Sequence, residues 1–300
     1  MQIEDFLKYI RYELNLSACT VLSYSTDLRQ FAEYLTGGTG EGLDVASVTA
    51  GDIRAWIAHL SKRGVSARSI RRKVQAVRAF YRYLIKRGDA IENPAADVEL
   101  AKLRKPLPVF VREENINTLL DEEVDAGEFV EVRDKLIVMM LYTTGIRRAE
   151  LIGLRDADVD VAKREMKVLG KRDKERIVPF GAELAEWIGR YRELRDKKAA
   201  STATGAFFVR PSGEALYPML VQRIVKEKLV EAGGSPRQSP HVLRHTFASA
   251  MLNGGASLNS VKELLGHESL AATQVYTHIT VRELKSNYEH AHPRATKKGG

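Results

Sequence analysis

The sequence predicts a mainly α-helical protein of two domains, with a small antiparallel β-sheet in the second domain. Three observations lead to this fold class. Apolar residues recur at helical spacing through the first part of the chain. Two short strand-like segments flank a charged turn near residue 172. The 300 residues are 44% hydrophobic, which suffices for a separate core in each domain.

Residues 1–97 are predicted to form an N-terminal domain of four helices. The first helix covers residues 2–14, and each of the other three follows a serine or threonine that can act as its N-cap. These caps are Ser17, Thr49 and Ser66. Glycines at positions 37, 64 and 88 end the same three helices, because glycine readily takes the left-handed conformation that closes a helix.

A linker at 98–108, which contains two prolines, separates these helices from a mixed domain at 109–300. In this second domain we expect strands at 165–169 and 176–180. The periodicity predicts helices at 132–143, 183–198, 216–232, 240–252, 258–265 and 281–290.

The charge pattern favours a polyanionic partner. The formal net charge is +8, and residues 62–87 hold ten lysines and arginines without one acidic residue. The arginines that fall outside the apolar stripe of the fourth helix are predicted to bind DNA phosphates: Arg68, Arg71, Arg72, Arg78 and Arg82. The alternative is a cationic face that is merely solvated.

Several other classes of protein are disfavoured. A single cysteine, Cys19, excludes an internal disulfide framework and fits a reducing cytoplasm. No apolar run is long enough to cross a bilayer, and the N-terminus does not resemble a signal peptide. His245 and His278 lack a cysteine partner and the usual ligand spacing, so no metal site is expected. We therefore expect a cytoplasmic protein without a membrane segment or metal.

Four segments carry residues that could act on a phosphate. Arg147 and Glu150 lie three residues apart, and a charged hairpin follows Gly170. His241 and Arg244 share a predicted helix. The fourth segment, 266–278, contains His267 and Tyr276. Taken singly, these residues have ordinary explanations: a surface ion pair, a charged turn, a structural histidine and a core aromatic.

Taken together and in this order, the segments resemble the tyrosine recombinase (lambda-integrase-like) family, and most closely its Xer-type members. The matching stretches are LYTTGIRRAELIGL, VLGKRDKERIVPF, SPHVLRHTFASAML and LLGHESLAATQVYTHIT. The resemblance covers nearly the whole chain and implies a SAM-like core-binding domain followed by a catalytic domain. It puts six residues in catalytic positions: Arg147, Lys171, His241, Arg244, His267 and the nucleophile Tyr276.

The resemblance also assigns roles to these residues. Glu150 would orient the basic groups around it. Lys171 would be the general acid, although Arg172 stands where relatives commonly have glycine, which leaves Lys174 as an alternative. The reaction would pass through a covalent 3′-phosphotyrosine and a Holliday junction, with no metal, ATP or other cofactor.

Partners and biological role follow from the same resemblance. DNA-bound homo- or hetero-tetramers would form, and the C-terminal helix at 281–290 would dock onto a neighbouring protomer; packing on its own domain is the alternative. A second Xer recombinase and a DNA translocase would be further partners in the resolution of chromosome dimers. The competing functions are an integrase or invertase of a mobile element, a type IB topoisomerase and a non-catalytic DNA-binding protein.

Overall fold

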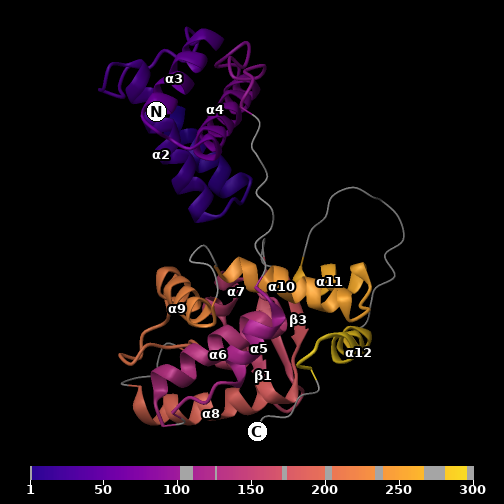
Figure 1. Cartoon of the computed structure of the whole chain (residues 1–300). Helices are drawn as coiled ribbons and strands as arrows, with labels where there is room; N and C mark the ends of the chain where they lie inside the picture. Colours follow the sequence, from indigo (N-terminus) through magenta and orange to yellow (C-terminus); the bar gives the residue numbers. More distant parts are fainter. Residues whose placement is uncertain are drawn as a thin grey trace. The chain divides into compact units, whose positions relative to one another are not determined.

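In the computed structural model, the chain divides into two compact units, Met1–Leu107 and Pro108–Gly300. The structure describes residues 2–101, 111–125, 127–170, 174–199, 205–233, 239–266 and 281–295. The first unit is helical, and the second combines helices with a small sheet (Figure 1). Within the described residues, no helix has the length and apolar character needed to cross a membrane.

The N-terminal unit is the predicted bundle of helices. α1 (Gln2–Lys8) continues as a π-helical turn, η1 (Tyr9–Glu13), and is followed by α2 (Ala18–Leu35), α3 (Ala50–Lys62) and α4 (Ala67–Arg87). The three predicted caps are confirmed, because the side chains of Ser17, Thr49 and Ser66 each accept a backbone hydrogen bond from the first turn. Phe31, Trp56 and Phe80 are among the side chains that fill the core.

A buried ion pair joins α2 to α4. Asp27 is 0% exposed and lies 2.9 Å from the ammonium group of Lys73, which is itself 6% exposed. The guanidinium of Arg72 contacts the other oxygen of the same carboxylate. Since removing one member of a buried pair leaves an uncompensated charge, these contacts fix how the two helices cross.

The second unit is built around the buried helix α6. Its helices are α5 (Glu113–Asp121), α6 (Phe129–Thr144), α7 (Arg148–Gly153), α8 (Ala182–Lys198), α9 (Pro218–Glu231), α10 (Pro240–Asn253), α11 (Leu258–Leu265) and α12 (Val281–Ala291), with a 3₁₀ turn, η2 (Asp156–Asp158). The side chains of α6 are buried from residue 135 to residue 144. The main apolar core of this unit forms around α6, and a second cluster joins the end of α10 to α11 and α12.

The sheet has three antiparallel strands in the order β1 (Val159–Asp160), β2 (Glu165–Leu169) and β3 (Glu175–Pro179). Met166 pairs with Val178, and both side chains enter the core. The sequence predicted β2 and β3. It missed β1 because two residues are too few to show an alternating pattern.

Helix α12 packs against α10, α11 and β3 of its own chain. Tyr288, Ala291 and Ala295 are buried there in one apolar cluster that includes Phe247. Just beyond the helix, Arg294 is 4% exposed and forms ion pairs with Glu183 and Asp121. The structure thus has the helix in the arrangement that the sequence left as the alternative to docking on a neighbour.

Candidate active site

The turn between α6 and α7 presents Arg147. Gly145 ends α6 with a φ of +62°, and a Cβ at this position would lie 2.4 Å from a ring carbon of Phe247. Glycine is required here both for its left-handed backbone and for its lack of a side chain. Arg147 follows at the N-cap of α7, where its backbone N–H donates to Oε2 of Glu150 and its Nη1 donates to Oε1, each at 2.7 Å.

Glu150 is the anionic centre of the site. It is 6% exposed, and a second arginine, Arg176 of β3, donates to both of its carboxylate oxygens at 2.8 Å. Burial by itself would raise the pKa of Glu150, but the hydrogen bonds from Arg176 and Arg147 hold that pKa below its ordinary value. The pair is therefore a buried network around a charged carboxylate, and not the isolated surface ion pair that the spacing alone suggests.

The carboxyl end of α11 binds three guanidinium groups. Arg244 donates from Nη2 to the carbonyl of Leu265 at 2.5 Å, and Arg147 donates from Nη2 to the carbonyl of Gly266 at 2.9 Å. Arg176 donates from Nε to the carbonyl of Leu264 at 2.8 Å. These carbonyls are the negative end of the helix dipole, which favours cations. The structure thus brings the predicted pair Arg147 and Arg244 to one place.

Positive charge is concentrated around Arg244. This residue is 7% exposed, and its other terminal nitrogen donates to the carbonyl of Gly145 at 2.6 Å. Burial, followed by the charge of Arg147, lowers the pKa of Arg244 to about 10. The guanidinium stays protonated at neutral pH, so three arginines face the single carboxylate Glu150. Such an excess of fixed cations suits a phosphate.

His241 lies one turn before Arg244 on the exposed side of α10. Partial burial, followed by the positive charges of Arg148 and Arg244, lowers its pKa. A neutral imidazole near neutral pH can accept a proton.

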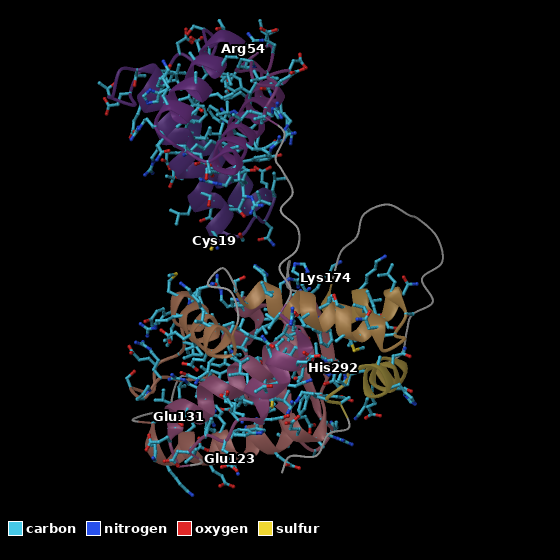
Figure 2. The ribbon with its side chains drawn as sticks, in the orientation of Figure 1. Cys19, Arg54, Glu123, Glu131, Lys174 and His292 are labelled. Atoms are coloured by element: carbon cyan, nitrogen blue, oxygen red, sulfur yellow. The ribbon has the colours of Figure 1, made fainter. Side chains whose placement is uncertain are left out.

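Three predicted catalytic residues, Lys171, His267 and Tyr276, lie outside the described residues, as does Arg172. The residues just before two of them are described, namely Gly170 before Lys171 and Gly266 before His267. The N–H of Gly170 donates to the carbonyl of Lys174 at 2.8 Å and closes the hairpin. Lys174, labelled in Figure 2, directly precedes the first residue of β3. The choice between Lys171 and Lys174 therefore stays open.

The predicted DNA-binding arginines of α4 differ in their surroundings. Arg78 donates to the carbonyls of Ala95 and Val98, and Arg71 donates to the carbonyl of Ala101. These two side chains tie the segment after α4 to the bundle. Arg68 and Arg82 are exposed, and together with Arg72 they give a more sparsely charged face than the sequence suggested.

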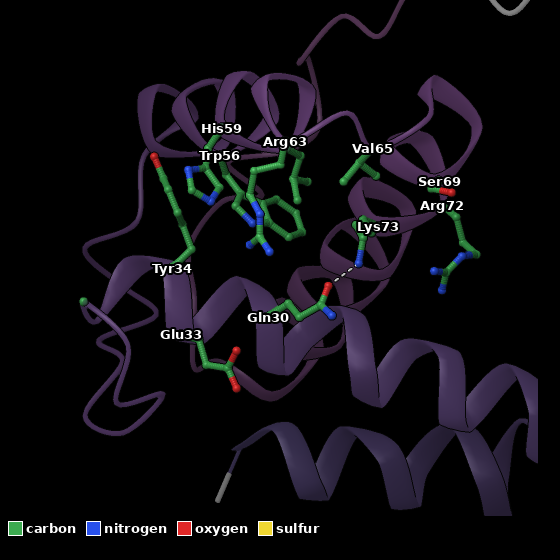
Figure 3. Close-up of a pocket in the computed structure, with 12 residues that line it drawn as sticks. Gln30, Glu33, Tyr34, Trp56, His59, Arg63, Val65, Ser69, Arg72 and Lys73 are labelled. Atoms are coloured by element: carbon green, nitrogen blue, oxygen red, sulfur yellow. Dashed lines mark hydrogen bonds between the residues drawn. The ribbon is translucent and has the colours of Figure 1, made fainter.

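A cavity of about 730 Å³ opens between α2, α3 and the start of α4 (Figure 3). The sequence pattern gave no sign of it, since its walls come from three helices. Basic groups exceed acidic ones among its lining residues, which are Gln30, Glu33, Tyr34, Gly37, Trp56, His59, Leu60, Arg63, Val65, Ser69, Arg72 and Lys73.

The described residues contain no group of three or more histidine, cysteine or carboxylate side chains placed to hold a metal ion. Arg176 is the site residue that sequence reasoning missed. An arginine in a short strand gives no sign of a carboxylate partner that lies 26 residues earlier in the chain.

Comparison with known families covers both units. The model of the phage integrase family matches residues 109–283, and the model of the phage integrase N-terminal SAM-like domain matches residues 3–88. The chain belongs to the phage integrase family and is thus a tyrosine recombinase, an enzyme that cleaves and rejoins DNA.

Individual relatives agree with this result. The tyrosine recombinase XerC of Chlorobaculum tepidum is 40% identical over 97% of this chain and 94% of its own length. XerC of Mycobacterium sp. (strain JLS) is 38% identical over 98% of this chain and 99% of its own. Two solved structures share the fold. The Tn1549 transposon integrase with circular intermediate DNA has a TM-score of 0.68 at 19% identity, covering 96% of this chain and 98% of its own. XerH bound to its difH substrate has a TM-score of 0.67 at 22% identity, covering 95% and 82%.

Proposed function

We propose that this chain is a Xer-type site-specific recombinase that forms a covalent 3′-phosphotyrosine through Tyr276. The observation that carries the proposal is the junction of Arg147, Arg244 and Glu150 at the carboxyl end of α11, because His267 is the next residue along the chain. The XerC relatives match over nearly their full length, which supports an Xer-type recombinase over a family member with a different role.

The two arginines would stabilise the charge that develops on the phosphate. Each retains N–H groups beyond those that bind Glu150 or the carbonyls, and a guanidinium has five in all. In the transition state the non-bridging oxygens gain negative charge, and preorganised donors of this kind are each worth about 10²–10³ in rate. His267 would supply a further hydrogen bond to the same oxygens.

Proton transfer would balance the cleavage step. The hydroxyl oxygen of Tyr276 attacks the phosphorus, and its proton passes to His241, whose lowered pKa leaves it neutral and able to accept. The bond from phosphorus to the 5′ oxygen breaks, and its electron pair stays on that oxygen. Lys171, or Lys174 in its place, then protonates the 5′ oxygen. Attack by a 5′-hydroxyl of another strand reverses these steps without ATP.

The N-terminal unit would supply much of the DNA affinity. Arg68, Arg72 and Arg82 lie on the exposed side of α4 and are suited to backbone phosphates, although the guanidinium of Arg72 also contacts Asp27. Arg71 and Arg78 would act mainly by holding the end of the domain in place. We propose that the two units close on duplex DNA as a clamp.

Assembly and biological role complete the proposal. Four protomers, of one or two kinds, would exchange strands in pairs through a Holliday junction, and α12 would leave its own domain to dock on a neighbour. The task would be the resolution of chromosome dimers in the cytoplasm, with a second recombinase and a DNA translocase as partners. Integration or inversion of a mobile element uses the same chemistry, so the genomic position of the bound site would separate these roles.

The deciding experiment is a suicide substrate, a duplex with a nick beside the cleavage position of the footprinted site. The wild-type chain should become covalently linked to DNA, whereas Tyr276→Phe should bind the duplex and form no adduct. A wild-type chain that binds without forming an adduct would instead be a non-catalytic DNA-binding protein. Relaxation of a supercoiled plasmid that lacks the site would indicate a type IB topoisomerase.

A further inference from the structure

Arg176 makes a two-pronged contact with Glu150. It lies on β3 opposite Val168 of β2, and its side chain is 14% exposed. Nη1 donates to Oε1 of Glu150 and Nη2 donates to Oε2, both at 2.8 Å. This fork fixes the carboxylate that in turn binds Arg147, and it links the hairpin strand to the start of α7.

The same guanidinium binds the end of α11 and lies close to the hairpin. Its Nε donates to the carbonyl of Leu264 at 2.8 Å, and a Cβ added at Gly266 would lie only 3.0 Å from Nη1. At the hairpin, a Cβ added at Gly170 would lie 3.5 Å from the same nitrogen. All three nitrogens of Arg176 therefore bind protein atoms, so the side chain is placed to hold its neighbours in position.

We infer that Arg176 is a positioning residue. It would hold the hairpin that carries the general-acid lysine (Lys171, or Lys174 in its place) next to the phosphate-binding arginines Arg147 and Arg244. Its guanidinium lies beside Gly170, which precedes Lys171, and beside Gly266, which precedes His267. Through Glu150 it also reaches Arg147. One side chain thus fixes the starting point of three catalytic segments. This inference rests on the proposed function.

A lysine cannot replace this arrangement. Its ammonium group is a single point of charge and cannot place a planar fork on a carboxylate while a third nitrogen binds a carbonyl. Arg176→Lys keeps the charge and the DNA attraction but releases the hairpin. A misplacement of about 1 Å at a catalytic group typically costs about 10² in rate. We therefore expect cleavage to fall about 100-fold with an unchanged Kd for DNA.

The chain offers a matched control in Arg195. It is also a buried arginine of the second unit, 5% exposed, and it donates to the carboxylate of Asp156 and to the carbonyl of Phe207. Its hydrogen-bond partners Asp156, Asp196 and Phe207 all lie outside the candidate site. Arg195→Lys removes a similar network and should leave cleavage within about twofold of wild type, at temperatures where both variants are folded.

Two nicked suicide duplexes test the inference in the full-length chain. One is ordinary DNA, and the other carries sulfur in place of the bridging 5′ oxygen at the cleavage position. Sulfur leaves without being protonated, so it bypasses the general acid. For Arg176→Lys we expect the sulfur duplex to be cleaved at least about tenfold faster than ordinary DNA, because the misplaced general-acid lysine is then no longer needed.

If Arg176→Lys cleaves ordinary DNA like wild type, or if sulfur restores nothing, the inference is wrong. Absence of any adduct with the wild-type chain refutes the proposed function instead. If the wild-type chain forms no adduct, the role of Arg176 can still be measured without DNA. Hydrogen exchange at the amides of Gly170 and Gly266 should quicken in Arg176→Lys and in Arg176→Gln, but not in Arg195→Lys, and unchanged exchange would overturn the positioning role.

Discussion

Mild acid should destabilise the catalytic unit through His292. This imidazole is 3% exposed and is surrounded by the rings of Tyr142, Phe247 and Tyr288, at centroid distances of 5.3–5.4 Å (Figure 2 labels His292). Burial, and then the charge of Arg294, lowers the pKa of His292 from 6.5 to about 3. The folded chain therefore keeps this ring neutral through the range in which the unfolded chain protonates it.

The size of the effect follows from linkage. Because the folded pKa is lowered, the unfolded state binds more protons below pH 6.5, and stability falls as the pH falls. Each pH unit below 6.5 costs about 1.4 kcal/mol. Between pH 7.5 and pH 5.0 the loss from His292 amounts to about 2 kcal/mol, and it changes little as long as the folded pKa stays below about 4.

Urea denaturation followed by tryptophan fluorescence measures this loss. The chain has two tryptophans, Trp56 in the N-terminal unit and Trp187 in α8. In a Trp56→Phe background the signal reports the catalytic unit alone. His292→Phe removes the titrating group, so its stability should fall between the two pH values by about 2 kcal/mol less than that of the parent.

The control is His290→Phe, which changes an exposed histidine at the end of α12. It should retain the full pH dependence of the parent. Both variants keep the ion pair between Arg294 and Glu183, so its contribution cancels in the comparison. If the parent and His292→Phe lose equal stability between pH 7.5 and pH 5.0, the buried neutral ring is not what makes the unit acid-sensitive.

Three further predictions follow from the site and the bundle. Glu150→Gln should lower the free energy of unfolding by about 3–5 kcal/mol in the same fluorescence assay, because it leaves buried arginines without a counter-charge; a loss below about 1 kcal/mol would contradict this reading of the site. Gly145→Ala should cost at least about 1–3 kcal/mol and slow cleavage, since its methyl group would overlap the ring of Phe247; wild-type cleavage by this variant would show that the turn tolerates a side chain. Arg82→Ala should reduce the slope of log Kd against log salt by roughly 0.9, whereas Arg78→Ala should lower the stability of the N-terminal unit and leave the slope unchanged; equal slopes for both variants would contradict the division of roles on α4.

Much of the fold could be predicted from the sequence because its signals are local. The N-cap side chains that begin three of the helices are visible in the sequence as Ser17, Thr49 and Ser66. Gly88 ends α4 in the left-handed conformation that its position suggested. The spacing of Arg147 and Glu150 likewise gave a contact that the structure contains.

The rest depends on contacts between distant segments. The bonds from Arg176 to Glu150 and Leu264 span 26 and 88 residues, and no periodicity signals them. The buried pair of Asp27 and Lys73 shows the same limit, because Lys73 counted in the sequence as part of a cationic run and lies in the core of the bundle. Burial of a charge is decided by the fold and is not visible in composition.

If Tyr276 is the nucleophile, it carries the DNA after cleavage, and locating the covalent link measures this directly. Trypsin should release residues 263–282 as one peptide, which contains Tyr276 and no other tyrosine. After the suicide-substrate reaction and nuclease trimming, mass spectrometry should find this peptide linked through phosphate to the 3′ end of a nucleotide. A link to a different tyrosine, or to the 5′ end of the DNA, would refute Tyr276 as the nucleophile that forms a 3′-phosphotyrosine.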